Sequence, residues 1–143
     1  MDKVSYLDIG ANHPCYLNNT YIFYLKGSKG VNIEPNPKMI ERFNHQRPND
    51  VSIAAGAAPV KGELTYYELD SPELNTFSKE HALHMQEKGH TIHRETILPV
   101  ITINYIIETY FNNISPNVLF IDTEGMDFDL VNSIDFTKYK PEV

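Results

Sequence analysis

Residues 4–10, VSYLDIG, form a short and largely apolar run that is closed by a glycine. Such a run is typical of a strand that is buried on both faces of a parallel sheet. Similar runs return at Gly30–Glu34 and Val51–Ala55, and each of them follows a segment with helical character. This alternation of strand and helix predicts a parallel α/β sheet with right-handed crossovers.

Two segments supply the helices between these strands. The aromatic and β-branched content of Thr20–Lys26 lets a strand compete with a helix there. Because a parallel crossover needs a helix, we predict one, with Asn18 or Asn19 as its N-cap and Gly27 as its left-handed end. Asn36-Pro37 gives the second helix a strong start, a capping residue followed by proline at the first helical position.

The second half of the chain is less regular. We predict an edge strand or hairpin arm at Glu63–Leu69 and a polar helix at Ser78–Lys88. A strand at Leu98–Ile103, a helix at Asn104–Phe111 and a fourth buried strand at Val118–Asp122 follow. Together the patterns predict one Rossmann-like domain over residues 1–143, with a mainly parallel sheet and helices on both faces. Lys140–Val143 is typical of the start of another strand, so we expect the domain to be truncated at its C-terminus.

Composition and charge argue against several classes of protein. The net charge is -7 and the 12 basic residues are scattered, whereas a nucleic-acid surface needs concentrated basic charge. The N-terminus does not resemble a secretory signal, and no apolar run approaches the roughly 18–20 residues of a membrane span. A single cysteine, Cys15, excludes an intramolecular disulfide. We therefore expect a cytoplasmic protein with no membrane span and no nucleic-acid partner.

Polar residues follow the first two strands, at the edge where parallel sheets bind ligands. Gly10 would let the backbone approach a ligand closely, although a tight turn alone would also explain it. Glu34 ends the second strand 24 residues later. An acidic residue about 20 residues after the glycine is placed to accept the ribose hydroxyls of an adenosine, the alternative being a solvated carboxylate at a helix N-terminus. The two features together favour a bound cofactor.

Asp122 and Glu124 follow the fourth strand and are expected at the same edge of the sheet. Either carboxylate could act as a general base, or as a ligand for the substrate or a divalent cation. The alternative is that they cap the next helix together with Asp127 and Asp129, and for this second pair we favour capping.

The histidines point to no metal site. His81 and His84 stand three residues apart on a predicted helix, with His90 and His93 further on, but no cysteine lies near them and structural zinc needs a closed set of four ligands. His13 is expected to be a loop residue without a catalytic part. Cys15 has no base to activate it and is expected to pack.

Three blocks of the sequence resemble the FkbM-type S-adenosylmethionine-dependent methyltransferases. They are Tyr6–Asn12 (YLDIGAN), Val31–Pro37 (VNIEPNP) and Phe120–Val131 (FIDTEGMDFDLV), and the tail Ser133–Pro141 is similar to the family as well. The resemblance implies that Asp8, Gly10 and Asn12 line the methionine and ribose side of the cofactor and that Glu34 binds the ribose hydroxyls. Ala11 and Pro35 complete the expected cofactor-binding set. This chain has His13-Pro14 where the family often has a further glycine, and we expect the His-Pro pair to make this loop stiffer.

The predicted reaction is displacement of the cofactor's sulfonium methyl group by an acceptor oxygen, which we favour over nitrogen, with Asp122 or Glu124 as the base. The resemblance suggests a small-molecule, sugar or lipid acceptor. An NAD-dependent oxidoreductase is disfavoured because Gly10–Cys15 lacks the second and third glycines of the dinucleotide fingerprint. A truncated or degenerate, non-catalytic cofactor-binding domain stays open as an alternative. Unpaired sheet edges would favour a homo-oligomer.

Overall fold

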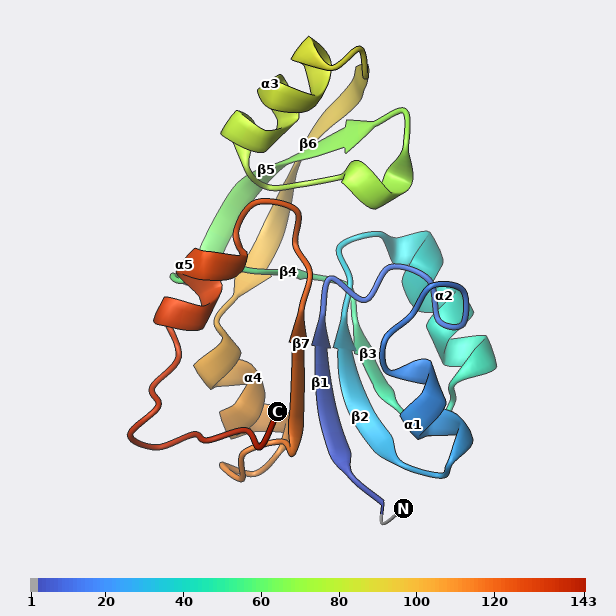
Figure 1. Cartoon of the computed structure of the whole chain (residues 1–143), viewed down its shortest axis with the longest axis vertical. Coiled ribbons are helices and arrows are strands. Elements are labelled where there is room, and N and C mark those ends of the chain that lie inside the picture. The colour runs from blue at the N-terminus through green and yellow to red at the C-terminus, as the bar shows by residue number, and fades with distance from the viewer. Residues whose placement is uncertain (1–2) are drawn as a thin grey trace.

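Four parallel strands build the central sheet of the computed structural model, which describes residues 3–143 (Figure 1). Their order across the sheet is β3 (Val51–Ile53), β2 (Lys29–Ile33), β1 (Ser5–Ile9) and β7 (Val118–Ile121). Leu7 pairs with Val31 on one side and with Leu119 on the other, so β1 lies inside the sheet. The expected parallel α/β sheet is confirmed.

The last residue of the chain lies along the outer edge of β7. Val143 donates its backbone N–H to the carbonyl of Asn117 at 3.1 Å, and its own carbonyl accepts from the N–H of Leu119 at 2.9 Å. This is the alternating pattern of a parallel strand pair. Residues 140–143 form no regular strand, so the strand predicted to start at Lys140–Val143 is not seen beyond this pair of bonds.

Helices cover both faces of the sheet (Figure 1). On one face, α4 (Ile103–Tyr110) and α5 (Asp127–Asn132) close the main core. This core joins the buried side chains of Leu7, Ile9, Val31, Ile33, Ile103, Ile106, Ile107, Leu130, Ile134 and Tyr139, among others. Alternate strand residues such as Tyr6 and Asp8 point to the other face, as the period of two requires. That face is covered by α1 (Tyr21–Leu25) and α2 (Pro37–Gln46).

The predicted crossover helices are confirmed, with one correction at α1. Its N-cap is Thr20 rather than Asn18 or Asn19. The side chain of Thr20 makes no cap hydrogen bond, and its hydroxyl instead donates to Asp8 and accepts from Arg47. Gly27 ends the turn with a positive φ of 82°, as predicted. The start of α2 follows the prediction, since the Asn36 side chain accepts from the N–H of Lys38.

An insertion between β3 and α4 stands over the carboxyl ends of the central strands (Figure 1). It holds β4 (Gly56–Ala57), β5 (Gly62–Leu69), the 3-10 helix η1 (Pro72–Leu74), α3 (Lys79–Glu87) and β6 (Ile92–Ile101). The strands form a second sheet in the order β4-β6-β5, in which β5 and β6 are antiparallel. The predicted hairpin arm and polar helix are confirmed, whereas β6 begins at Ile92 and not at Leu98 because it pairs with β5 along almost its whole length. No helix among residues 3–143 has both the length and the apolar character needed to cross a bilayer.

Candidate functional site

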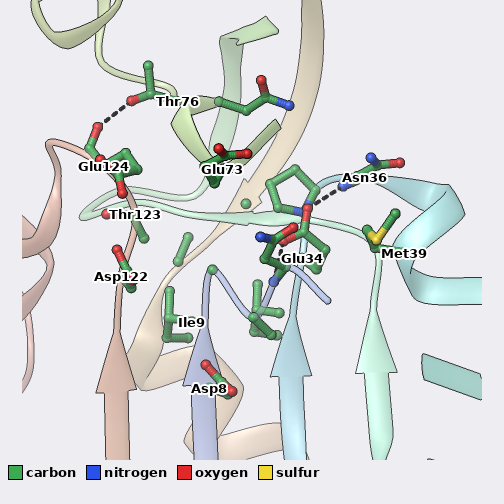
Figure 2. Close-up of a pocket in the computed structure, with 18 of the residues that line it drawn as sticks. Asp8, Ile9, Glu34, Asn36, Met39, Glu73, Thr76, Asp122, Thr123 and Glu124 are labelled. Carbon is green, nitrogen blue, oxygen red and sulfur yellow. Dashed lines mark hydrogen bonds between the residues drawn. The ribbon is translucent and has the colours of Figure 1, made fainter. Parts of the chain in front are cut away.

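A cavity of about 290 Å³ lies between the carboxyl edge of the central sheet and the insertion (Figure 2). All eight residues that the sequence singled out for the site line it: Asp8, Gly10, Ala11, Asn12, Glu34, Pro35, Asp122 and Glu124. Asp8 lies near the end of β1 and the others lie in the loops after β1, β2 and β7, which parallel strands bring to one edge. The insertion supplies the facing wall.

Glu34 is a buried carboxylate at one end of the cavity. It is 6% exposed, and it lies beside Asn36 and Met39 (Figure 2). One carboxylate oxygen accepts the backbone N–H of Asn36 and the other accepts that of Asn12, each at 2.8 Å. Burial raises the pKa of Glu34, and these two hydrogen bonds act in the opposite direction. Because a carboxylate offers about four lone pairs, each oxygen can accept a further donor from the cavity.

Gly10 is explained by the turn that it makes. Its φ is +78°, and a Cβ at this position would lie 2.0 Å from the carbonyl oxygen of Asp122. The backbone N–H of Gly10 donates to Ile33 at 2.9 Å, and that of Ala11 donates to the same carbonyl at 3.1 Å. The close approach of the β1 and β7 loops therefore requires a glycine here, whatever the cavity binds.

Asp8 is held from behind by the loop that follows β1. It is 3% exposed, and one of its oxygens accepts from the hydroxyl of Thr20 at 2.7 Å and from the amide of Asn18 at 3.3 Å. Burial raises the pKa of Asp8 from 3.8 to about 6, against the opposing influence of Thr20, Arg47 and Asn18. Burial thus disfavours the charged form of Asp8, and its hydrogen bonds and Arg47 favour it.

Arg47, at the end of α2, ties this loop to the sheet, and sequence reasoning missed it. Its guanidinium is fully buried and pairs with Asp50 at 2.8 Å. The five N–H groups donate to Asp50, the carbonyl of Pro14, the side-chain oxygen of Asn18, the hydroxyl of Tyr6 and the hydroxyl of Thr20. All five donors are therefore satisfied. The sequence showed only a basic residue near a helix end, which gives no sign of such burial.

Asp122 and Glu124 lie at the opposite end of the cavity from Glu34 (Figure 2). Burial raises the pKa of both carboxyls, the charge of Asp127 adds to the effect on Asp122, and that of Asp122 adds to the effect on Glu124. The prediction that Asp127 caps the next helix is wrong, because its side chain makes no cap hydrogen bond. Its carboxylate accepts from the backbone N–H of Thr123 at 2.7 Å, while α5 has Met126 as N-cap and no side-chain cap bond. Asp127 therefore braces the loop that carries Asp122 and Glu124.

The insertion adds residues that the sequence did not point to. Tyr66, Pro72, Glu73, Asn75, Thr76 and Phe77 form the wall that faces the sheet. The rings of Tyr66 and Phe77 pack in a tilted arrangement, with their centroids 4.8 Å apart and their planes at 43°. Their positions depend on how the second sheet docks on the first, and no local pattern in the sequence reports that.

The remaining candidates are accounted for by local contacts. A ring nitrogen of His13 accepts from the backbone N–H groups of Cys15 and Tyr16, as expected for a loop residue. The thiol of Cys15 donates to the Gln46 side chain at 2.9 Å. Within residues 3–143, no group of three or more His, Cys, Asp or Glu side chains is arranged to hold a metal ion.

Comparison with known proteins gave one match. The family model described as Methyltransferase FkbM domain matches residues 8–143. Searches of curated proteins and of solved structures gave no significant match. The matched range contains the last two residues of β1, all of β2 and β7, and the loops that line the cavity.

Proposed function

The chain belongs to the FkbM methyltransferase family, and from this premise we propose that it uses S-adenosylmethionine to methylate a hydroxyl group of a small-molecule, sugar or lipid acceptor. We propose further that residues 1–143 form a single domain of this type. The observation that carries the proposal is the Glu34 carboxylate, which is buried, fixed by two backbone N–H groups and part of the cavity wall.

The residues around Glu34 fit the adenosine part of this cofactor. A vicinal pair of ribose hydroxyls offers two donors, and the two Glu34 oxygens offer two acceptors. Apolar side chains that suit an adenine ring line the same cavity, among them Met39, Ala55 and Phe77. None of the described lining residues is Lys or Arg, so no cationic side chain is placed to neutralise a pyrophosphate. These features support S-adenosylmethionine over a dinucleotide.

The other end of the cavity fits the acceptor. S-adenosylmethionine supplies a methyl group on a positively charged sulfur, so the protein has to align the acceptor oxygen, exclude water and take up a proton. Asp122 and Glu124 are the carboxylates at that end. A raised pKa makes each a stronger base than an ordinary surface carboxylate, which suits removal of a hydroxyl proton.

Calorimetric titration of the wild type and of Glu34→Ala with S-adenosylmethionine, and separately with NADH, tests the proposal. We expect saturable binding of S-adenosylmethionine alone and at least about tenfold weaker binding in the variant, a loss of about 1.4 kcal/mol. Glu63→Ala is the matched control, because Glu63 is exposed on β5 and does not line the cavity. Thermal unfolding of each variant shows whether loss of the bonds to Asn12 and Asn36 has disturbed the fold.

The outcomes separate the alternatives. Binding of NADH instead of S-adenosylmethionine would make the chain an oxidoreductase, and binding of neither would leave a domain without cofactor function. Equal affinity in wild type and Glu34→Ala would remove the ribose assignment. Release of S-adenosylhomocysteine with methyl glucoside or phenol as hydroxyl probes then tests the transfer itself.

A further inference from the structure

The loop after β7 meets the insertion at Glu124. The hydroxyl of Thr76 donates to the backbone carbonyl of Glu124 at 2.6 Å and accepts from the N–H of Ser78 at 2.9 Å. Thr76 and Glu124 are 48 residues apart in the sequence. This bond therefore fixes the height of the insertion above the carboxyl edge of the sheet.

The backbone at this contact adopts two uncommon conformations. Glu124 has a φ of +54°, which residues with a side chain rarely adopt, and Gly125 follows with a φ of +112°. A Cβ on Gly125 would lie 3.0 Å from the Cβ of His81 and 3.1 Å from that of Ser78. The loop thus bends so that the first turn of α3 can approach it closely. Strained backbone of this kind concentrates at functional sites, where surrounding contacts hold it in place.

His81, on the first turn of α3, faces the Glu124 side chain. Its Nε2 lies 3.4 Å from a Glu124 carboxylate oxygen, with the two side chains 20% and 35% exposed. This nitrogen is buried and makes no hydrogen bond within the described part of the chain. A buried polar atom without a partner is uncommon and calls for an explanation. The 3.4 Å contact falls short of a hydrogen bond, and a small movement of the ring would shorten and align it.

We propose that His81 is a positioning residue that holds the Glu124 carboxylate in the cavity as the base for the acceptor hydroxyl. This inference rests on the proposed methyl transfer. In that step the acceptor oxygen forms its bond to the methyl carbon while the carbon–sulfur bond breaks, and the electron pair of that bond stays on sulfur. The hydroxyl proton passes to the Glu124 carboxylate. The insertion therefore contributes to the chemistry through α3, besides enclosing the acceptor.

The charges around Glu124 show why the imidazole matters. Glu73 faces it from η1, and Asp122 and Asp127 face it from its own loop, so all three repel a charge on Glu124. Burial raises the pKa of Glu124 and Asp122 raises it further, whereas His81 lowers it. Among these neighbours His81 alone can carry a positive charge. Its loss leaves the carboxylate among like charges.

The pairing is tested by following the side-chain carboxyl carbon of Glu124 by NMR as a function of pH, in the wild type, His81→Gln and His84→Gln. Glutamine keeps an N–H donor on α3 but cannot become charged. His84 is the matched control, because it lies on the same helix, is exposed and faces Glu87 at 3.8 Å. We expect His81→Gln to raise the pKa of Glu124 by about 0.5, and His84→Gln to leave it unchanged. The same Glu124 titration in wild type and His81→Gln would overturn the proposal.

A second experiment measures S-adenosylhomocysteine release with the hydroxyl probes as a function of pH, in the wild type and in His81→Gln. We expect His81→Gln to lower kcat and to move its acidic limb upward, with unchanged affinity for S-adenosylmethionine by calorimetry. An unmoved pH profile would refute the positioning role even if the NMR titration showed the pairing. If the wild type methylates none of the probes, the proposed function fails at that point, while the NMR titration still decides whether His81 and Glu124 are coupled.

Discussion

Replacing Arg47 with methionine removes the charge at the centre of the buried network while filling much of the same space. Asp50, whose side chain is also fully buried, would keep three donors. These are the hydroxyl of Tyr6, the backbone N–H of Gly30 and the side-chain amide of Asn32. It would lose the counter-charge that lets it stay ionised inside the protein.

The size of the effect follows from this burial. Removing one partner of a buried ion pair costs about 3–5 kcal/mol, because the other charge is left uncompensated. The free energy of unfolding of a small protein is about 5–15 kcal/mol in total, so Arg47→Met should remove a large part of the stability. At about 3 °C per kcal/mol, the melting temperature should fall by about 10 °C or more.

The loss should also depend on pH through Asp8. The folded protein holds the pKa of Asp8 at about 6, above its ordinary value of 3.8. The native state therefore binds the proton more tightly, and the stability that this supplies is present below about pH 4 and lost as the pH rises through 6. This difference amounts to about 3 kcal/mol. Arg47 lowers the pKa of Asp8, so without it the decline should extend above pH 6.

Urea unfolding followed by circular dichroism at pH 5 and pH 7.5 measures both effects. Arg47→Met, Asp50→Asn and the double variant form a cycle, in which the double variant should be destabilised by less than the sum of the two single variants. A destabilisation below about 1 kcal/mol in Arg47→Met would refute the central role of the ion pair. A loss of equal size at both pH values would refute the link to Asp8.

Two further predictions concern the loops of the cavity. Gly10→Ala should cost at least about 3 kcal/mol or prevent folding, because its Cβ would lie 2.0 Å from the Asp122 carbonyl, whereas Gly62→Ala, with open space around it, should be close to neutral in urea unfolding. Asp127→Ala should destabilise the protein by about 1–3 kcal/mol, because it removes the acceptor of the Thr123 N–H; unchanged hydrogen exchange at the Thr123 amide would contradict this role.

The sheet and half of the cavity could be predicted from the sequence, because they depend on short-range patterns. Apolar runs that end in Gly10 and Glu34 mark the strands, and parallel strands place their carboxyl ends together. That rule also brought Asp122 and Glu124 to the same edge. The predicted N-cap of α1 was wrong because a pattern of capping residues does not show that the Asn18 side chain bonds Asp8, Ala11 and Arg47 instead.

The other half of the site depends on contacts between distant parts of the chain. Thr76 reaches Glu124 across 48 residues, and no pattern in the sequence marked it as a site residue. His81 was set aside because it had no cysteine partner, whereas the structure places it against a carboxylate. Arg47 was missed for the same reason, since burial of a charge is decided by the partners that the fold assembles.

Asp8 and Glu34 look equivalent in the sequence, as carboxylates at the ends of neighbouring strands, but the structure separates their roles. Glu34 is held by backbone N–H groups alone, so its position is set by the turns after β1 and β2. Asp8 is held by Thr20 and Asn18, and both of these side chains accept from Arg47. The charge of Asp8 is therefore coupled to the end of α2, outside the cavity. A substitution there should alter the pH dependence of the loop after β1 while leaving the bonds of Glu34 in place.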